Sequence, residues 1–216
     1  MNGIIQELTE LLKTKNIGTD SDRALLLDFQ ATLEIKPEKA IKLEKDALAQ
    51  IENITADNAR LVSNLHANLG GLYRMNGHPD LAREHMEKSI SLLDQFNLLH
   101  INDSIPQIAN YAMFLTEQQE PERGISELQK LSGIIKEYHS DDCLDYAKVQ
   151  ETLGTIYLMT ANLPQAKTHF KRAFKIYEKI WADEPEMIEA KYQEIQELYP
   201  QIGFCIGKNL SGLLTK

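Results

Sequence analysis

The chain has 216 residues, a net charge of −9 and 43% hydrophobic residues, an ordinary composition for one sizeable globular core or for an elongated array. The acidic balance argues against a generic nucleic-acid or anionic-membrane surface, because such surfaces need clustered Lys and Arg. No apolar run approaches the ~20 residues of a membrane-spanning helix, and the N-terminal stretch has no secretory cleavage pattern. Since the two cysteines, Cys143 and Cys205, have no metal-ligand spacing, we expect buried thiols in a cytoplasmic protein.

Apolar residues recur at spacings of three and four along most of the chain, which predicts a succession of helices. The first spans residues 4–14, and we expect residues 1–20 to be an N-terminal capping helix or the remnant of an upstream repeat. Helix pairs follow at 21–33 and 37–51, 57–75 and 79–96, 105–117 and 121–138, and 143–160 and 163–181. A helix over 186–199 opens an incomplete fifth unit, and an apolar, Gly-broken segment at 203–214 lies in a tail of residues 201–216.

Proline and aspartate positions support these boundaries. Proline is tolerated in the first helical turn, where its missing N–H costs nothing, and four prolines precede or open the second helix of each pair: Pro37, Pro79, Pro121 and Pro164. Aspartate is a favoured N-cap residue, and three aspartates precede helical periods: Asp57, Asp103 and Asp183.

A repeat with a period of 42 residues is the main signal in the sequence. The stretches KPEKAI at 36–41, HPDLAR at 78–83, EPERGI at 120–125 and NLPQAK at 162–167 align without drift. Their small residues fall at Ala40, Ala82, Gly124 and Ala166. Upstream stand Leu69, Gly70 and Tyr73 in one unit and Leu153, Gly154 and Tyr157 in another, and large apolar residues follow at Met86, Leu128 and Phe170.

This order of residues resembles the tetratricopeptide repeat. The usual unit is about 34 residues, and a longer unit of 42 is similar to the kinesin light chain type, which bacterial repeat proteins also use. The resemblance covers roughly residues 21–200, with about four repeats and an incomplete fifth. It implies an all-α fold: a right-handed superhelical solenoid of antiparallel helix pairs. The first repeat departs from the pattern, because Asp28 stands at the Gly position and Ala31 at the Tyr position.

Two adjacent glycines have different predicted roles in this register. Gly70 lies where the two helices of a unit cross most closely, near Ala82 and Met86. Gly71 falls on the face predicted to bind a partner, where it would leave room for a ligand backbone. Asn76-Gly77 is expected to end the first helix with a left-handed residue.

The sequence offers no catalytic constellation. The six histidines form no HExxH pattern, and no phosphate-binding glycine motif occurs. The acidic group Asp141, Asp142 and Asp145 fits the first turn of a helix better than a metal site. We therefore expect a non-catalytic protein without cofactor or metal.

The resemblance implies a concave groove, lined mainly by the first helix of each pair, that holds an extended peptide or a partner helix. Asn at one groove position of related repeats bonds a peptide backbone, and Asn68 and Asn110 occupy that place one period apart. The groove should be acidic toward its C-terminal end, through Glu151, Glu194 and Glu197. The candidate binding residues are Asn64, Asn68, Gly71, Arg74, Asn110, Met113, Lys148, Glu151, Thr152 and Thr155.

The leading functional hypothesis is a scaffold that binds a protein or peptide in this groove. An alternative is the sensing arm of a bacterial signalling-peptide receptor or of a larger ATPase or transcription regulator. A third is a self-associating structural protein, in which residues 203–214 mediate a homodimer.

Overall fold

The computed structural model describes residues 7, 18–101, 104–198 and 200. All regular secondary structure in these residues is helical. The helices are α2 (Asp20–Thr32), α3 (Pro37–Leu48), α4 (Ala59–Met75), α5 (Pro79–Gln95), α6 (Ser104–Glu117), α7 (Pro121–Tyr138), α8 (Leu144–Met159), α9 (Leu163–Ile180) and α10 (Pro185–Leu198). These bounds confirm the predicted helices from residue 20 to 198 to within one helical turn. The predicted helix at 4–14 and the segment 203–214 lie outside the described residues.

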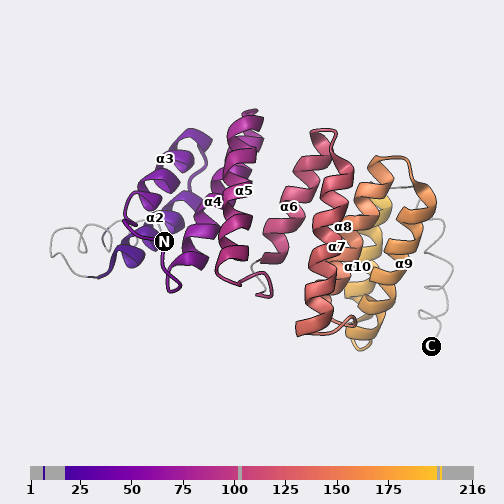
Figure 1. Ribbon diagram of the computed structural model, residues 1–216. Coiled ribbons are helices and arrows are strands. Elements are labelled where there is room, and N and C mark those ends of the chain that lie inside the picture. Colours follow the sequence, from indigo (N-terminus) through magenta and orange to yellow (C-terminus); the bar gives the residue numbers. More distant parts are fainter. Residues whose placement is uncertain (1–6, 8–17, 102–103, 199, 201–216) are drawn as a thin grey trace. The chain divides into compact units, whose positions relative to one another are not determined.

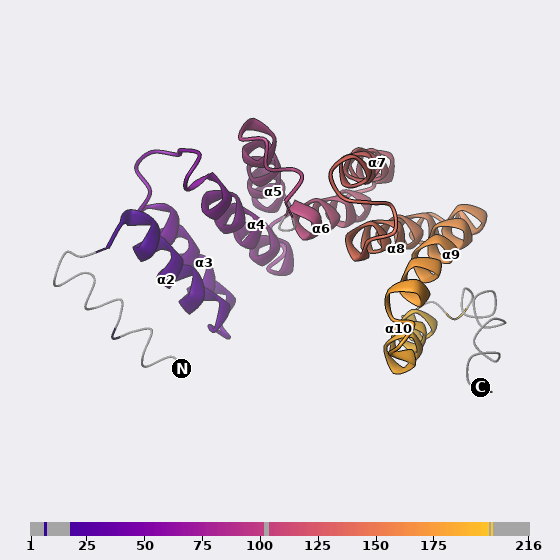
Figure 2. The same ribbon diagram turned by 90° about the horizontal axis from the view of Figure 1, so that it is seen from below.

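The helices belong to two compact units, residues 1–111 and 112–216, and α6 begins in the first and ends in the second. In the first unit α2 packs on α3, α3 on α4 and α4 on α5, and α2 also touches α4 (Figure 1). In the second unit α7 packs on α8, α8 on α9 and α9 on α10. From α2 to α5, and again from α7 to α10, helices that follow one another in the chain therefore lie side by side, as a second view also shows (Figure 2).

The helix starts follow the proline prediction, but neither of the two described aspartates, Asp57 and Asp183, directly precedes a helix. Proline occupies the first or second position of α3, α5, α7 and α9, as expected. Asp57 is not the cap of α4, because the helix begins later and Asn58 stands at its N-cap, with its side chain bonded to Thr55 and Asn53 and not to the helix. Asp103 lies outside the described residues, and Asp183 lies two positions before Pro185. Cys143 is half-buried and caps α8, since its Sγ accepts from the Tyr146 backbone N–H at 3.5 Å.

The turn between the helices of a pair recurs at the same register position. Gly77 has φ +72°, as the sequence predicted, and Gln119 and Ala161 adopt the same left-handed conformation at 64° and 58°. After each of them an N–H bonds the carbonyl five residues back: His78 to Tyr73 at 2.9 Å, Glu120 to Leu115 at 2.8 Å and Asn162 to Tyr157 at 2.7 Å. This six-to-one bond is the Schellman helix end, which satisfies carbonyls that the helix leaves open.

In the three helix pairs from α4 to α9 the helices cross at a residue with little or no side chain. A Cβ added to Gly70 would lie 2.6 Å from Met86 Cγ, and one added to Gly154 would lie 2.9 Å from Phe170 Cδ2. The expected role of Gly70 as a crossing point is confirmed. In α6 and α7 the glycine is on the second helix, because a Cβ on Gly124 would lie 2.6 Å from the Ala112 carbonyl oxygen. Either helix can therefore supply the gap.

The core consists of side chains that repeat around these crossings. In the first unit Ala24, Leu27, Ala47 and Leu65 are buried together. In the second unit Ala166, Phe170, Phe174 and Ile195 form a similar cluster. None of the described helices is both long enough and apolar enough to span a lipid bilayer.

Candidate binding site

A cavity of about 200 Å³ opens between α4, α5 and the first turns of α6. Its lining residues are Ala67, Gly71, Arg74, Met75, Met86, Ser89, Gln107 and Asn110. We call this cavity the Asn110 pocket. It brings together three of the predicted binding residues, Gly71, Arg74 and Asn110, with side chains from α5 that the sequence did not single out.

Open space at Gly71 and a thioether at Met86 shape the pocket. No atom lies within 4 Å of the position that a Cβ on Gly71 would occupy. Met86 is buried beneath the neighbouring Gly70 and contributes apolar surface to the lining. A ligand backbone could therefore approach α4 closely at Gly71, as the sequence predicted.

A buried polar network fixes the base of the pocket. Gln107 is 8% exposed, and its Oε1 accepts hydrogen bonds from Ser63 Oγ at 2.8 Å and Ser89 Oγ at 2.5 Å. Its Nε2 donates to Asn64 Oδ1 at 2.5 Å. With both ends of its amide engaged, Gln107 cannot rotate without leaving buried hydroxyls unsatisfied. The signal in the sequence was Ser89, a polar residue in a register position where other repeats carry Ala or Leu.

Asn110 differs from Asn64 and Asn68 because no described residue bonds its side-chain amide. It is exposed, and it forms no hydrogen bond with any described residue. Asn64 instead accepts from Gln107, and Asn68 donates to Asp28 Oδ1 at 2.8 Å and to Glu44 Oε1 at 3.2 Å. The two asparagines at the same register position are therefore not equivalent. Asn110 can both donate to and accept from a ligand, whereas Asn68 is held by two carboxyl groups.

The polar residues predicted to bind a partner in the second unit form hydrogen bonds or ion pairs within α8 or with α9 and α10. Lys148 lies 3.7 Å from Asp145, Thr152 Oγ1 donates to the Lys148 carbonyl at 3.0 Å, and Thr155 Oγ1 donates to the Glu151 carbonyl at 3.1 Å. Such bonds to the preceding turn satisfy the hydroxyls locally. Met113 is half-buried and does not line the Asn110 pocket.

The expected acidic end of the groove contains a cation, Lys191, which pairs with two of the three predicted acids. This carboxylate accepts from Tyr177 Oη at 2.6 Å and from Lys191 Nζ at 2.8 Å, and Lys191 also reaches Glu194 at 3.0 Å. Burial lowers the pKa of Lys191, but its hydrogen bonds and charge interactions with Glu151 and Glu194 outweigh burial and raise that pKa above its ordinary value. Sequence reasoning missed this pairing because Lys191 belongs to the next helix pair.

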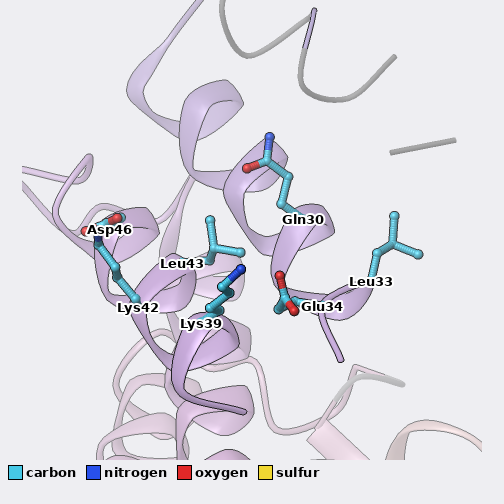
Figure 3. Close-up of a pocket in the computed structure, with 7 residues that line it drawn as sticks. All are labelled: Gln30, Leu33, Glu34, Lys39, Lys42, Leu43 and Asp46. Atoms are coloured by element: carbon cyan, nitrogen blue, oxygen red, sulfur yellow. The ribbon is translucent and has the colours of Figure 1, made fainter. Parts of the chain in front are cut away.

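A second cavity, of about 370 Å³, lies between α2 and α3 (Figure 3). It contains none of the predicted binding residues, and charges of both signs surround it. In Figure 3 the Lys39 and Glu34 side chains point toward the same opening, while Leu33 points away. Its lining residues are Gln30, Leu33, Glu34, Lys39, Lys42, Leu43 and Asp46. We take the Asn110 pocket as the candidate binding site, because buried hydrogen bonds hold Gln107 in its lining.

The described part of the chain holds no group of three or more His, Cys, Asp and Glu side chains arranged to bind a metal ion. Of the acidic group that ends at Asp145, Asp142 pairs with Lys179. The hydrogen bond and the charge of Lys179 hold the pKa of Asp142 below its ordinary value.

The model of the tetratricopeptide repeat family matches residues 104–179. The matched residues comprise α6 to α9, two of the helix pairs that follow the 42-residue register. Residues 104–179 are therefore assigned to the tetratricopeptide repeat family. Domains of this family generally act as protein-interaction scaffolds, and the comparisons found no catalytic domain.

Solved structures of repeat proteins share the fold. The crystal structure of BtubC (BKLC) from P. vanneervenii is 17% identical with a TM-score of 0.73, over 98% of this chain and 87% of that one. A crystal structure of nearly identical TPR-like repeats from a putative kinesin light chain of Podospora anserina is 16% identical with a TM-score of 0.63, over 83% and 90%. MamA is 15% identical with a TM-score of 0.55, over 81% and 87%. The search of curated proteins gave no significant match.

Proposed function

We propose that this protein binds an extended segment of a partner protein, with the Asn110 pocket as the central contact. The observation that carries the proposal is the Asn110 amide, which has no internal partner among the described residues and stands beside open space at Gly71. An amide that donates and accepts at once suits a peptide backbone, because a backbone presents one N–H and one C=O per residue.

The size of the pocket favours a peptide over a whole small molecule. Sites for drug-sized ligands occupy about 300–1,000 Å³, whereas the Asn110 pocket measures about 200 Å³. We infer that it holds one side chain of the partner segment against Met86, while the backbone of that segment passes over Gly71. Arg74 borders the same pocket and would lie beside the bound segment.

The experiment is a selection of peptides on the full chain, followed by affinity measurements with variants. Gly71→Leu adds a side chain at a lining position of the pocket, and its Cβ meets no atom within 4 Å. We expect selected peptides to bind this variant at least about tenfold more weakly, and Asn110→Ala about three- to tenfold more weakly, the effect of one lost hydrogen bond.

Gly133→Leu is the matched control, because Gly133 is an exposed helical glycine with equally open surroundings in α7. It should bind the selected peptides as the wild type does. Equal affinity of the selected peptides for the Gly71→Leu and Gly133→Leu variants would contradict the proposal, as would a selection that yields no binding peptide.

A further inference from the structure

The first helix pair replaces the usual apolar crossing with two acids. Asp28 stands one 42-residue period before Gly70, and Glu44 stands one period before Met86. In α4 and α5 the later pair forms the closest contact between the helices. A pair of carboxyl groups at this place gives up apolar packing, and burying them costs free energy unless another interaction stabilises them.

Three mutually packed helices bring these groups together. Asp28 comes from α2, Glu44 from α3 and Asn68 from α4. Asn68 Nδ2 donates to both carboxyl groups, at 2.8 Å to Asp28 Oδ1 and at 3.2 Å to Glu44 Oε1. We call these three residues the acid cluster.

One carboxyl oxygen of the acid cluster receives no hydrogen bond from a donor among the described residues. Glu44 is 2% exposed, and its Oε2 is buried without such a donor, while the Glu44 and Asp28 carboxyl groups share a hydrogen bond with each other. Neither Asp28 nor Glu44 forms an ion pair with any described residue. Lys45, the next residue on α3, lies with its Nζ 5.5 Å from the centre of the Tyr73 ring, and His85 stacks on that ring at 5.4 Å. The Lys45 ammonium therefore lies over the ring of Tyr73, and burial lowers the pKa of His85, so the acid cluster has no counter-ion among the described residues.

The missing counter-ion decides how the cluster is charged. Burial, and secondly the charge of Asp28, raise the pKa of Glu44 to about 8, and burial also raises the pKa of Asp28. Two close carboxyl groups cannot both ionise without a compensating positive charge. At neutral pH the empty cluster holds a proton that a cation can replace.

We propose that the acid cluster binds the ammonium or guanidinium group of a lysine or arginine in the partner segment. Asp28 is half-buried and Asn68 is exposed, so the entrance to the cluster lies at the surface of α2 and α4. Asn68 also precedes Asn110 by one period, so the same face of the repeats carries both sites. This inference deepens the proposed function and rests on it for the identity of the ligand. The cation enters beside Asp28, and the Glu44 proton is released to solvent.

The test uses a small probe that does not depend on the Asn110 pocket. The peptide acetyl-Ala-Lys-Ala-amide is titrated into the full chain at pH 7 in two buffers of different protonation enthalpy. The carboxyl carbon of Glu44 is followed by NMR in the same titration. We expect weak binding, release of up to one proton for each peptide bound, and a shift of the Glu44 signal to its ionised form.

The controls separate a specific cation site from general attraction to an acidic protein. The same peptide with norleucine in place of lysine should not bind. The double variant Asp28→Gly/Glu44→Met restores the residues of the second pair and should fold, yet bind the lysine peptide at least about tenfold more weakly. Equal binding of both peptides, equal binding by the double variant, or a Glu44 signal that responds only to Mg²⁺ or Ca²⁺ would overturn the proposal.

The Asn110→Ala variant distinguishes this proposal from the broader one. It should bind the lysine probe as the wild type does, because Asn110 lies outside the acid cluster. If peptide selection on the Asn110 pocket fails while the lysine probe binds and releases a proton, the cation site stands and the peptide-groove function falls.

Discussion

Gly70 and Gly71 are neighbours on α4 with opposite surroundings. A Cβ on Gly70 would lie 2.6 Å from Met86 Cγ and 3.3 Å from both the Ala82 carbonyl oxygen and the Met86 nitrogen, whereas Gly71 faces open space. Glycine in a helix interior costs about 0.5–1 kcal/mol relative to alanine. At Gly70 the close packing offsets that cost, and at Gly71 nothing among the described residues does so.

The same substitution at the two positions should therefore have opposite effects. We expect Gly70→Ala to destabilise the protein by about 1–3 kcal/mol through overpacking against Met86. Gly71→Ala should stabilise it by about 0.5–1 kcal/mol, since the new methyl group meets no neighbour. Chemical unfolding followed by circular dichroism measures both. Loss of stability in both variants would show that Gly71 has a packing role after all.

Each helix pair from α4 to α9 is joined by a turn of the same form, with different residues at its left-handed position. Gly77 adopts positive φ easily, but Gln119 and Ala161 carry a Cβ that crowds the following carbonyl. The conformation persists because the six-to-one hydrogen bond and the packing of both helices hold it. Local sequence preference thus explains the turn at Gly77, whereas packing imposes it at the other two positions.

Glycine at these two positions should stabilise the protein. The left-handed conformation costs an L-residue about 1–2 kcal/mol, which glycine would relieve. Glycine also makes the unfolded chain more flexible, which lowers the free energy of unfolding by about 0.4–1 kcal/mol and so cancels part of the gain. We expect Gln119→Gly and Ala161→Gly each to raise the free energy of unfolding by about 0.5–1 kcal/mol, and Gly77→Ala to lower it by about 1 kcal/mol. Gln119→Ala is the control for loss of the side chain and should leave stability unchanged. If Gln119→Gly is no more stable than Gln119→Ala, the left-handed backbone conformation at residue 119 does not cost free energy.

The half-buried His66 and the buried Glu44 give the whole molecule an unusual dependence on pH. Burial, then the charges of His85 and Lys88, lower the pKa of His66 to about 4, while burial and Asp28 raise the pKa of Glu44 to about 8. As pH falls below about 6.5, the unfolded chain takes up the histidine proton first, so the His66 contribution to stability declines toward pH 4. As pH rises above about 4.5, the unfolded chain loses the glutamate proton first, so the Glu44 contribution declines until pH 8.

Between pH 6.5 and 8 the protonation of Glu44 changes the free energy of unfolding, whereas that of His66 does not. We expect the free energy of unfolding to fall through this window, with a slope of up to about 1.4 kcal/mol per pH unit for one proton. In Glu44→Gln this fall should disappear, because the amide does not titrate. Urea midpoints at half-unit pH steps measure the slope. A wild-type profile that is flat from pH 6.5 to 8, or a Glu44→Gln profile with the same slope, would show that Glu44 is ionised in the folded protein.

The spacing of residue types in the sequence predicted most of the fold. Small residues at a fixed period, apolar residues three and four apart and prolines in first turns act locally or between adjacent helices, so the helix bounds from residue 20 to 198 followed from the chain alone. The gap at Gly70 was also predictable, because its partner Met86 lies in the same repeat. The sequence did not predict that the glycine of the α6 and α7 crossing, Gly124, lies on the second helix of the pair. Either helix of a crossing can supply the small residue.

The state of the polar side chains was decided by tertiary structure. Asn68 and Asn110 are the same residue at the same register position, and the sequence treated them alike. Asn68 meets Asp28 and Glu44 from the preceding pair, whereas Asn110 stands beside Met86, which offers it no hydrogen bond. Whether an amide is satisfied depends on side chains about 20 to 45 residues away, whose directions no local pattern specifies. The sequence by itself determined the helices and their pairing, and only the packed structure decided that Asp28 and Glu44 bond the Asn68 amide whereas no described residue bonds the Asn110 amide.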